Sequence, residues 1–460
     1  LAHAHTFPAI ASVDLHSRSF LHLLAISAAT AFMAMCLSWL WRRRPQVYLV
    51  DYACFRPPER WRISYGAFLE HSALNGMSEK TRDFQKKIIQ HSGLSELTSL
   101  PPSYHFIPCR KGMAYSRDES STVFFSMLDD LFRRTSVAPS QIGILVVNCC
   151  LFYPSPSLSA MVVHRYRMRA DIKSFNLSGM GCAASLLALD MARHLLSVNK
   201  ETYALIVSSE NMSGRDYLGS KRSMLIANCL FRTGGAAILL SNRSSDRRRA
   251  KYRLLHTVRA NTAADDRSFF CITHGEDESG QVGVSLSKEL MSVAADALTR
   301  NMTAMAPLVL PMSEMAKYAF NYMARNAFRA QWKPYTPDFK KAFHHFCIHA
   351  GGKAVIEELE KNLMLSKQMT EASTMTLYRF GNTSSTSVWY EMAYLEAMQR
   401  VKKGDRLWQV GLGSGFKCFS AVWESAWDGK CTASNPWRDE DGHLAAFYPA
   451  QGLPDCVEID

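Results

Sequence analysis

The sequence predicts an α/β protein with a membrane-spanning segment near its N-terminus. Short apolar runs rich in Val and Ile alternate with helical patterns, which is typical of the α/β class. The 460 residues, 47% of them hydrophobic, are enough to bury a large core. An uncharged apolar stretch over residues 20–41 predicts the span, because it is long enough to cross a bilayer.

The N-terminal apolar stretch has the flanks of a membrane anchor. Trp39 and Trp41 suit a membrane interface, and three arginines follow at 42–44, so the positive-inside rule places the rest of the chain in the cytosol. A signal peptide is the alternative, but the stretch is too long and its basic residues follow it instead of preceding it. Residues 1–45 are therefore predicted to form the anchor.

Strand and helix patterns alternate from Pro45 onward. In the first half, buried strands are predicted at 46–55, 142–152, 202–210 and 234–242, with helices at 121–135, 157–168 and after Cys182. The second half has helical patterns at 285–301 and 353–365 and ends in strand-like residues at 406–423. We predict two α/β halves, 46–245 and 246–427, and a poorly ordered tail at 428–460.

Residues 311–336 differ from their surroundings in being rich in Met and aromatic side chains with amphipathic spacing. Two interpretations stay open for this segment. It either packs in the core, or it forms a lid that faces a membrane or lines an acyl chain.

Charge and cysteine content limit the partners and the compartment. The net charge is +12, and basic residues gather at 41–44 and 242–253, which suits a lipid surface or a phosphate-bearing ligand. No zinc-finger spacing, RNA-binding aromatic motif or basic heptad accompanies this charge, so no nucleic-acid partner is expected. The twelve cysteines lack the close, even spacing of disulfide scaffolds, and reduced thiols are predicted.

Cys182 is a candidate nucleophile. It follows Gly179 and Gly181 and precedes a run with good helix propensity, so it falls near a helix N-terminus. There, backbone N–H groups and the helix dipole favour thiolate over thiol, and the glycines leave the sulfur open to a bulky thioester. The alternative is a small buried thiol that packs in a tight turn.

Two further residues occupy comparable positions. His349 precedes a Gly-Gly turn into a helix, and Asn382 precedes a helix that we expect Ser or Thr to cap. Each falls where a strand is expected to end and a helix to begin, which is where α/β folds place their sites. A core histidine and a structural cap are the alternatives. Zinc bound by His345, Cys347 and His349 is a third possibility, but no acidic or further Cys ligand lies at familiar spacing, so no metal is expected.

Several long blocks resemble the plant 3-ketoacyl-CoA synthases of the thiolase-like superfamily. They include "SFNLSGMGCAASLLALDMA", "HHFCIHAGGKAV", "TLYRFGNTSSTSVWYE" and "GDRLWQVGLGSGFKC", and the match runs from about residue 47 to 423. The resemblance implies a duplicated α-β-α-β-α five-layer thiolase-like fold. It also implies a catalytic triad of Cys182, His349 and Asn382.

The resemblance further implies condensation of malonyl-CoA with a long-chain acyl-CoA in very-long-chain fatty acid elongation. Both thioesters are then substrates, and no other cofactor is expected. Anchoring in the endoplasmic reticulum membrane, a homodimer and contact with other elongase subunits are also implied. Two spans usually precede the catalytic domain in this family, and because the chain begins at Leu1 we expect further sequence upstream.

The "GLGSGF" loop supplies the candidates for oxyanion and substrate binding. These are Gly413, Ser414, Gly415, Phe416 and, from the strand before His349, His345. The family usually has Gly at the positions of Ser178 and Ser185 and often His at that of Asn261. These departures keep open a weakly active or inactive paralogue that modulates an elongase, and a cysteine thioesterase is the other alternative.

Overall fold

The computed structural model describes residues 27, 29, 30, 32, 33, 35, 46–326, 332, 333 and 335–439. The chain divides into two compact units, Leu1–Gln46 and Val47–Asp460. In the first unit residues 27, 29, 30, 32, 33 and 35 are helical and Gln46 is in neither a helix nor a strand, and the predicted span at 20–41 otherwise lies outside the described residues. The second unit holds all the elements named below.

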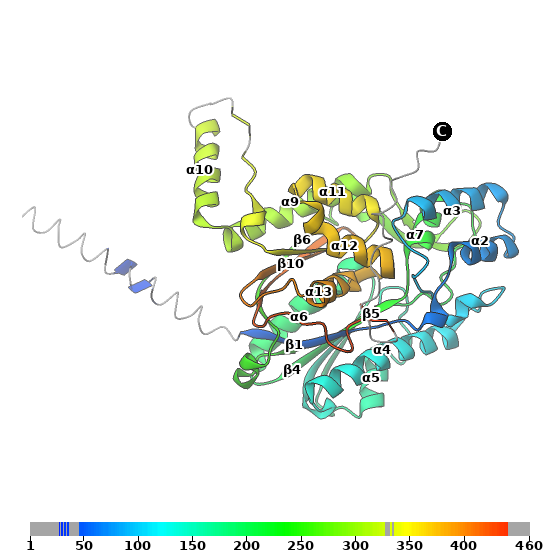
Figure 1. The fold of residues 1–460 in the computed structure, drawn as a ribbon, viewed down its shortest axis with the longest axis horizontal. Helices are drawn as coiled ribbons and strands as arrows, with labels where there is room; N and C mark the ends of the chain where they lie inside the picture. The colour runs from blue at the N-terminus through cyan, green and yellow to red at the C-terminus, as the bar shows by residue number, and fades with distance from the viewer. Residues whose placement is uncertain are drawn as a thin grey trace, which may run out of the picture. The chain divides into compact units, whose positions relative to one another are not determined.

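A nine-stranded mixed sheet forms the frame of the second unit (Figure 1). The strand order is β3-β2-β4-β5-β1-β6-β11-β10-β9. The bounds of the strands in this sheet are β1 Val47–Cys54, β2 Ile142–Asn148, β3 Lys173–Leu177, β4 Tyr203–Glu210, β5 Gly234–Ser241, β6 Tyr252–Asn261, β9 His345–Ile348, β10 Arg406–Gly413 and β11 Lys417–Ser425. A separate hairpin pairs β7 (Ile272–Glu276) with β8 (Val282–Leu286).

The two halves of the sheet repeat one pattern of strand directions. In the first half β2 is parallel to β4, and β5 is antiparallel to both β4 and β1. In the second half β9 is parallel to β10, and β11 is antiparallel to both β10 and β6. The halves join where β1 pairs with β6. The predicted boundary at 245/246 falls between β5 and β6, yet both halves belong to one compact unit.

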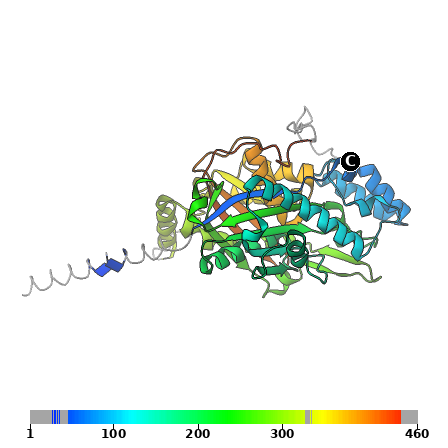
Figure 2. The same ribbon diagram turned by 90° about the horizontal axis from the view of Figure 1, so that it is seen from below.

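Helices cover the strands on both faces (Figures 1 and 2). One cluster of buried apolar side chains joins α4 (Met113–Thr135) and α5 (Leu158–Tyr166) to the first half of the sheet. Another joins α9 (Leu290–Val309) and α11 (Lys353–Leu363) to the second half. Between the halves, α6 (Ala184–Val198) and α13 (Ser387–Ala397) share a third cluster with strands of both.

Helix α6 has a composition that its position explains. Among the described residues, the stretch Gly181–Val198 has the length and mean hydropathy of a membrane span, and half of it is buried. Leu186, Leu189 and Leu196 are fully buried in the cluster between the two halves of the sheet. We conclude that α6 is apolar because it packs in the core on several sides.

The sequence pattern located β1, β2, β4, β5 and the region of β10 and β11, but it did not predict β3, β6, β7 or β8, and it missed several helices. Helices that we did not predict are α2 (Tyr65–Leu74), α3 (Glu79–His91), α7 (Arg222–Leu230) and α12 (Lys367–Phe380). The tail also differs from the prediction, because Trp437 is fully buried against Phe380 and Tyr394. A buried indole ties this part of the chain to the core, while residues from 440 onward lie outside the described residues.

Candidate active site

Cys182 lies in a 3-10 turn, Gly181–Ala183, that leads directly into α6. The predicted position near a helix N-terminus is therefore confirmed. The loop between β10 and β11 packs against this turn: a Cβ atom on Gly181 would lie 2.4 Å from the backbone nitrogen of Ser414. The same contact in reverse involves Gly413, where a Cβ atom would lie 2.8 Å from the nitrogen of Ala183. Glycine at both positions allows two backbones to meet beside the sulfur.

The two glycines before Cys182 have different roles, although both have φ of +67°. Around Gly179 an added Cβ would meet no atom within 4 Å, so that side of the turn is open, as predicted. Gly181 does not provide open space, which corrects the prediction. Its missing side chain makes room for Ser414.

We expect Gly181→Ala to destabilise the protein and remove most of its activity, and Gly179→Ala to do neither as strongly. Both substitutions place a side chain at positive φ, which costs about 1 kcal/mol. Only the methyl group introduced by Gly181→Ala would also collide with Ser414, adding about 1–3 kcal/mol of overpacking. Thermal unfolding and turnover of the two variants, measured side by side, check this. Equal losses would show that the Ser414 contact does not matter.

Burial raises the pKa of the Cys182 thiol to about 11, and the nearby Glu210 carboxylate adds to the rise. The Ser384 hydroxyl, which donates to Cys182 Sγ at 3.6 Å, opposes the rise. The helix N-terminus was expected to favour thiolate over thiol, but desolvation outweighs the local donors in the resting protein. The sulfur rests as a neutral thiol.

His349 follows β9 and is 4% exposed. Its Nδ1 atom lies 2.9 Å from Ser387 Oγ, and this hydroxyl also accepts a hydrogen bond from the backbone of Ala350 at 3.3 Å. Burial lowers the pKa of His349 to about 4. The imidazole is therefore neutral at physiological pH, and its Nε2 edge faces Gly351, where a Cβ atom would lie 3.1 Å from Nε2.

Asn382 is held in one orientation by both ends of its amide. Its Nδ2 donates to the carbonyl of Gly351 at 2.9 Å, and its Oδ1 accepts from the backbone N–H of Ser384 at 2.8 Å. Ser384 in turn reaches Cys182 through its hydroxyl. These hydrogen bonds link the segment of Cys182 to that of Asn382 and, through the carbonyl of Gly351, to the loop that follows His349. They support the predicted grouping of the three residues, which stays a prediction.

The low pKa of His349 predicts a loss of stability at acid pH. In the unfolded chain the group takes up a proton near pH 6.5, whereas in the folded protein it does so near pH 4. The unfolded state therefore binds more protons in this window, and stability falls as the pH drops from 6.5 to 4 by up to about 3 kcal/mol. We expect His349→Gln to remove that part of the slope in melting temperature against pH. An unchanged slope would show that His349 is not buried as a neutral group.

Two other predicted residues do not join the triad. His345 begins β9 and contacts Asp405, with 2.9 Å between Nε2 and Oδ2. Phe416 is 1% exposed, and its side chain packs in the apolar cluster with α9 and α11. Both are structural in this arrangement, which corrects their assignment to substrate binding. Within the part of the chain that the structure describes, no three His, Cys, Asp or Glu side chains gather as a metal group.

The three departures from the family pattern are accommodated differently. Ser185 is fully buried, and its hydroxyl donates to the carbonyl of Ser385 at 2.5 Å, next to the triad. Asn261 is exposed, and its side chain accepts from the backbone of Ala263 at 3.0 Å. Ser178 is half-buried. Among these three, only Ser185 contacts the segment that carries Asn382 and Ser384.

Sequence reasoning missed three residues that contact the candidate triad or the turn before Cys182. The hydroxyls in 383–387 were expected to cap α13, yet no side chain caps that helix. Ser384 contacts Cys182 and Ser387 contacts His349. Cys150 accepts a hydrogen bond from the backbone N–H of Gly181 at 3.2 Å. The run "NTSSTS" does contain these serines, but Ser and Thr are also common where they cap a helix, so the sequence did not indicate that they contact Cys182 and His349.

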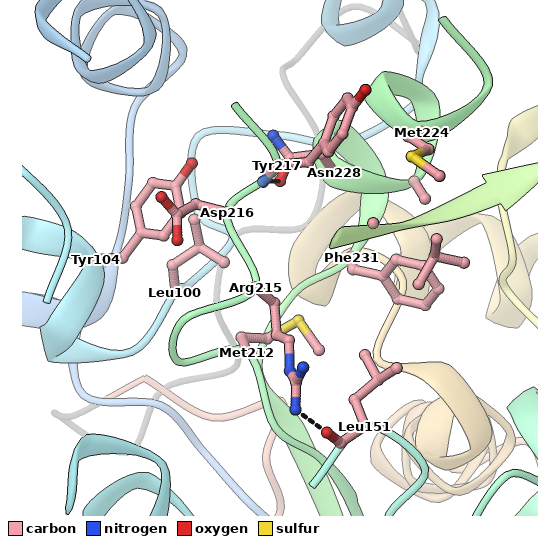
Figure 3. Close-up of a pocket in the computed structure, with 13 residues that line it drawn as sticks. Leu100, Tyr104, Leu151, Met212, Arg215, Asp216, Tyr217, Met224, Asn228 and Phe231 are labelled. Atoms are coloured by element: carbon pink, nitrogen blue, oxygen red, sulfur yellow. Dashed lines mark hydrogen bonds between the residues drawn. The ribbon is translucent and has the colours of Figure 1, made fainter. Parts of the chain in front are cut away.

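Near this site lies a pocket whose lining residues are drawn in Figure 3, and Cys182, His349 and Asn382 are not among them. The space between its lining atoms, open solvent at its mouth included, is about 470 Å³. Phe231 lines it and pairs with Asn382 through a backbone bridge, and Leu151 lines it next to Cys150. Most of the other lining side chains are apolar or aromatic, and Arg215, Asp216 and Asn228 are the polar ones.

Comparison with known proteins gives the family. A family model described as FAE1/Type III polyketide synthase-like protein matches residues 39–327, and one described as 3-Oxoacyl-[acyl-carrier-protein (ACP)] synthase III C terminal matches residues 340–425. The chain is 51% identical over 420 residues to 3-ketoacyl-CoA synthase 4 of Arabidopsis thaliana, covering 91% of this chain and 81% of that protein. It is 51% identical over 433 residues to 3-ketoacyl-CoA synthase 9 of the same plant, covering 94% and 82%.

Solved structures agree on the fold. The type III polyketide synthase domain of Steely1 from Dictyostelium superimposes with a TM-score of 0.64 at 15% identity, covering 83% of this chain and 99% of that one. The fungal type III polyketide synthase ORAS gives 0.64 at 16% identity, covering 82% and 99%. The fold is thus a mixed α/β thiolase-like fold. With half of its residues identical to those relatives over nine-tenths of its length, the chain belongs to the 3-ketoacyl-CoA synthase family.

Proposed function

We propose that this protein condenses malonyl-CoA with a long-chain acyl-CoA to give a 3-oxoacyl-CoA two carbons longer, with release of CO2 and CoA. Family membership supports this activity, and the contacts that join Cys182, Ser384, Asn382, Gly351 and His349 carry the assignment of the site. The two CoA thioesters are the substrates, and the reaction uses no other cofactor.

In the first half-reaction Cys182 takes the acyl group. Its neutral thiol must lose a proton, and we assign that proton to Nε2 of His349 as acyl-CoA enters. The thiolate is then stabilised by the Ser384 hydroxyl and by the N-terminus of α6. Its sulfur attacks the acyl carbonyl carbon, the bond to the CoA sulfur breaks, and CoA leaves with the proton from His349.

In the second half-reaction malonyl-CoA loses CO2, and the electron pair of the broken carbon–carbon bond forms an enolate. The oxygen of this enolate can accept two hydrogen bonds. One comes from Nε2–H of neutral His349, and the other comes from the Asn382 N–H that Gly351 does not occupy. The nucleophilic carbon then attacks the acyl carbonyl and displaces Cys182 as a thiolate.

Ser387 suits both halves of this cycle. A hydroxyl can donate to His349 Nδ1 or accept from it, so Nε2 is free to accept a proton first and to donate one later. A carboxylate at that position would only accept and would hold a proton on Nδ1. The low pKa of His349 keeps the imidazole neutral between these steps, so that Nε2–H can donate to the enolate oxygen.

We assign the oxyanion site of acyl transfer to backbone N–H groups of Cys182 and of the loop at Ser414. The close approach of that loop to Gly181 supports this assignment. It keeps Gly413, Ser414 and Gly415 in the site and omits Phe416 and His345. We also infer that the fold is a duplication, since both halves of the sheet share one order of strand directions.

The acyl chain, we infer, extends into the pocket beside Phe231 (Figure 3). Val284→Phe adds bulk to its lining, so we expect product chain lengths to shift downward by at least one two-carbon step. Val282, two residues earlier on β8, is 46% exposed and lies outside the lining, so Val282→Phe is the matched control. Gas chromatography of the products checks this. Identical distributions in the two variants would place the chain elsewhere.

Localisation and assembly belong to the same proposal. We propose that residues 20–41 anchor the chain in the endoplasmic reticulum membrane with the catalytic unit in the cytosol, supported by the arginines that follow the apolar stretch. A homodimer and contacts with other elongase subunits are proposed from the family alone.

The decisive experiment is expression in microsomes with malonyl-CoA and acyl-CoAs of graded length. Formation of 3-oxoacyl-CoA supports the proposal, and the product lengths define the substrate. Rapid release of free acid without malonyl-CoA would instead show a thioesterase. An acyl-enzyme that forms without any extension would show an inactive paralogue.

A further inference from the structure

Helix α10 (Met312–Asn326) turns its apolar face outward. Met312 and Phe320 are 83% and 61% exposed, and Met323 is 52% exposed. Helical spacing places them on one side together with two exposed alanines. We call this set the α10 apolar face; its members are Met312, Ala316, Ala319, Phe320 and Met323. Figure 1 shows α10 standing clear of the sheet.

Polar contacts hold the opposite side of α10 to the chain. The side chain of Glu314 is fully buried and accepts from Lys341 Nζ at 2.6 Å and from the backbone of Asp338 at 3.1 Å. Asn321 donates to the carbonyl of Lys333 at 3.1 Å. A helix that covers a core turns its apolar stripe inward. The contacts described for α10 lie on its polar side. The α10 apolar face is therefore uncovered and available to a partner.

The surroundings of the α10 apolar face suit a lipid surface. Trp332 packs on Phe320 with 5.8 Å between ring centroids and is 51% exposed. Aromatic side chains of this kind favour the membrane interface. Arg325 and Lys333 form no ion pair with an acidic side chain among the residues that the structure describes. Free positive charge beside apolar side chains attracts anionic lipid, whereas a second copy of α10 would bring like charges together.

The start of the catalytic unit lies toward the same end. Figures 1 and 2 both show α10 and the beginning of β1 at one end of the ribbon. The predicted span ends at Trp41 and β1 begins at Val47. Five residues, 42–46, therefore connect the predicted span to the strand that begins at this end of the catalytic unit.

We propose that the α10 apolar face, with Trp332, inserts into the interface of an anionic bilayer and forms a second membrane contact beside the N-terminal anchor. The contact is independent of the condensing activity. It would hold the catalytic unit at a fixed orientation on the membrane.

Photocrosslinking in lipid nanodiscs tests the proposal with the full chain. Phe320 is replaced by a photoreactive phenylalanine analogue, and Phe270, which is 63% exposed and precedes β7, is the matched control. Mass spectrometry then measures lipid adducts in discs of phosphatidylcholine with and without phosphatidylserine. We expect adducts at 320 to exceed those at 270 by at least about five-fold and to increase with phosphatidylserine.

Three results would overturn the proposal. They are equal lipid adducts at both positions, a crosslink at 320 between two copies of the chain, and no rise with anionic lipid. Because Phe320 is exposed, its replacement should leave the melting temperature unchanged, so a misfolded variant would be recognised. Lys333→Glu should lower the phosphatidylserine effect at 320 without changing adducts in phosphatidylcholine alone.

Discussion

Cys182→Ala is expected to abolish both acyl-enzyme formation and condensation. The sulfur is the atom to which the acyl group binds, so its removal leaves the acyl group without a point of attachment. Turnover should fall to below about one-thousandth of the wild-type rate, as for nucleophiles in related covalent mechanisms. Microsomes with the variant, incubated with acyl-CoA and malonyl-CoA, give the rate, and mass spectrometry of the tryptic peptide gives the acylation.

Cys431→Ala is the matched control for this variant. Cys431 is also partly exposed and lies in the segment after β11, far along the chain from the proposed site. Its removal should leave turnover within about two-fold of wild type, as is usual for a substitution away from the chemistry. Detectable 3-oxoacyl-CoA from Cys182→Ala would remove Cys182 from the mechanism.

Local sequence signals located Cys182 and His349 because each lies where a strand gives way to a helix, β3 before α6 and β9 before α11. Asn382 instead follows α12 and precedes α13, so the strand that we expected before it is wrong; only the turn at Gly381 marked its position. The way in which the fold brings these three segments together depends on the connections between its strands and helices. It depends on the way the two halves of the sheet place α6 and α13 together in one apolar cluster, which periodicity along the chain does not encode.

Three predictions from the sequence failed because they depended on where side chains point, how far apart they lie and how deeply they are buried. His345 and His349 share one face of an extended strand, but four residues of strand separate them by about 13 Å, so the first does not reach the site of the second. Gly415 has φ of +80°, and after the turn at this residue the side chain of Phe416 packs in the apolar cluster with α9 and α11. The pKa of Cys182 depends on burial, which a motif shows poorly.

The insertion at 311–336 is another case in which a sequence pattern does not show where side chains point. Its amphipathic spacing was read correctly, but spacing does not say which face turns inward. Glu314 decides the question, since its buried carboxylate accepts from Lys341, from Lys317 and from the backbone of Asp338. A charged side chain at that position of a helix pattern is normally assigned to solvent.

His349→Ala and Asn382→Ala are expected to separate the two half-reactions. Both variants should still acylate Cys182, though more slowly when His349 is absent, because the thiol proton then passes to solvent. Neither should decarboxylate malonyl-CoA at more than about one-hundredth of the wild-type rate, since each loses one of two hydrogen bonds to the enolate oxygen. Intact-protein mass spectrometry measures the acyl-enzyme, and release of labelled CO2 measures decarboxylation.

The control for these variants is His256→Ala, which removes a half-buried histidine from β6, and it should keep both activities. Asn382 also fixes Ser384, so its loss can disturb Cys182 through a positioning contact rather than through the enolate. Ser384→Ala distinguishes the two routes. If Asn382 acts on the enolate, Ser384→Ala slows acylation and spares decarboxylation, whereas Asn382→Ala does the reverse. A variant of His349 or Asn382 that decarboxylates malonyl-CoA normally would contradict the enolate assignment for that residue.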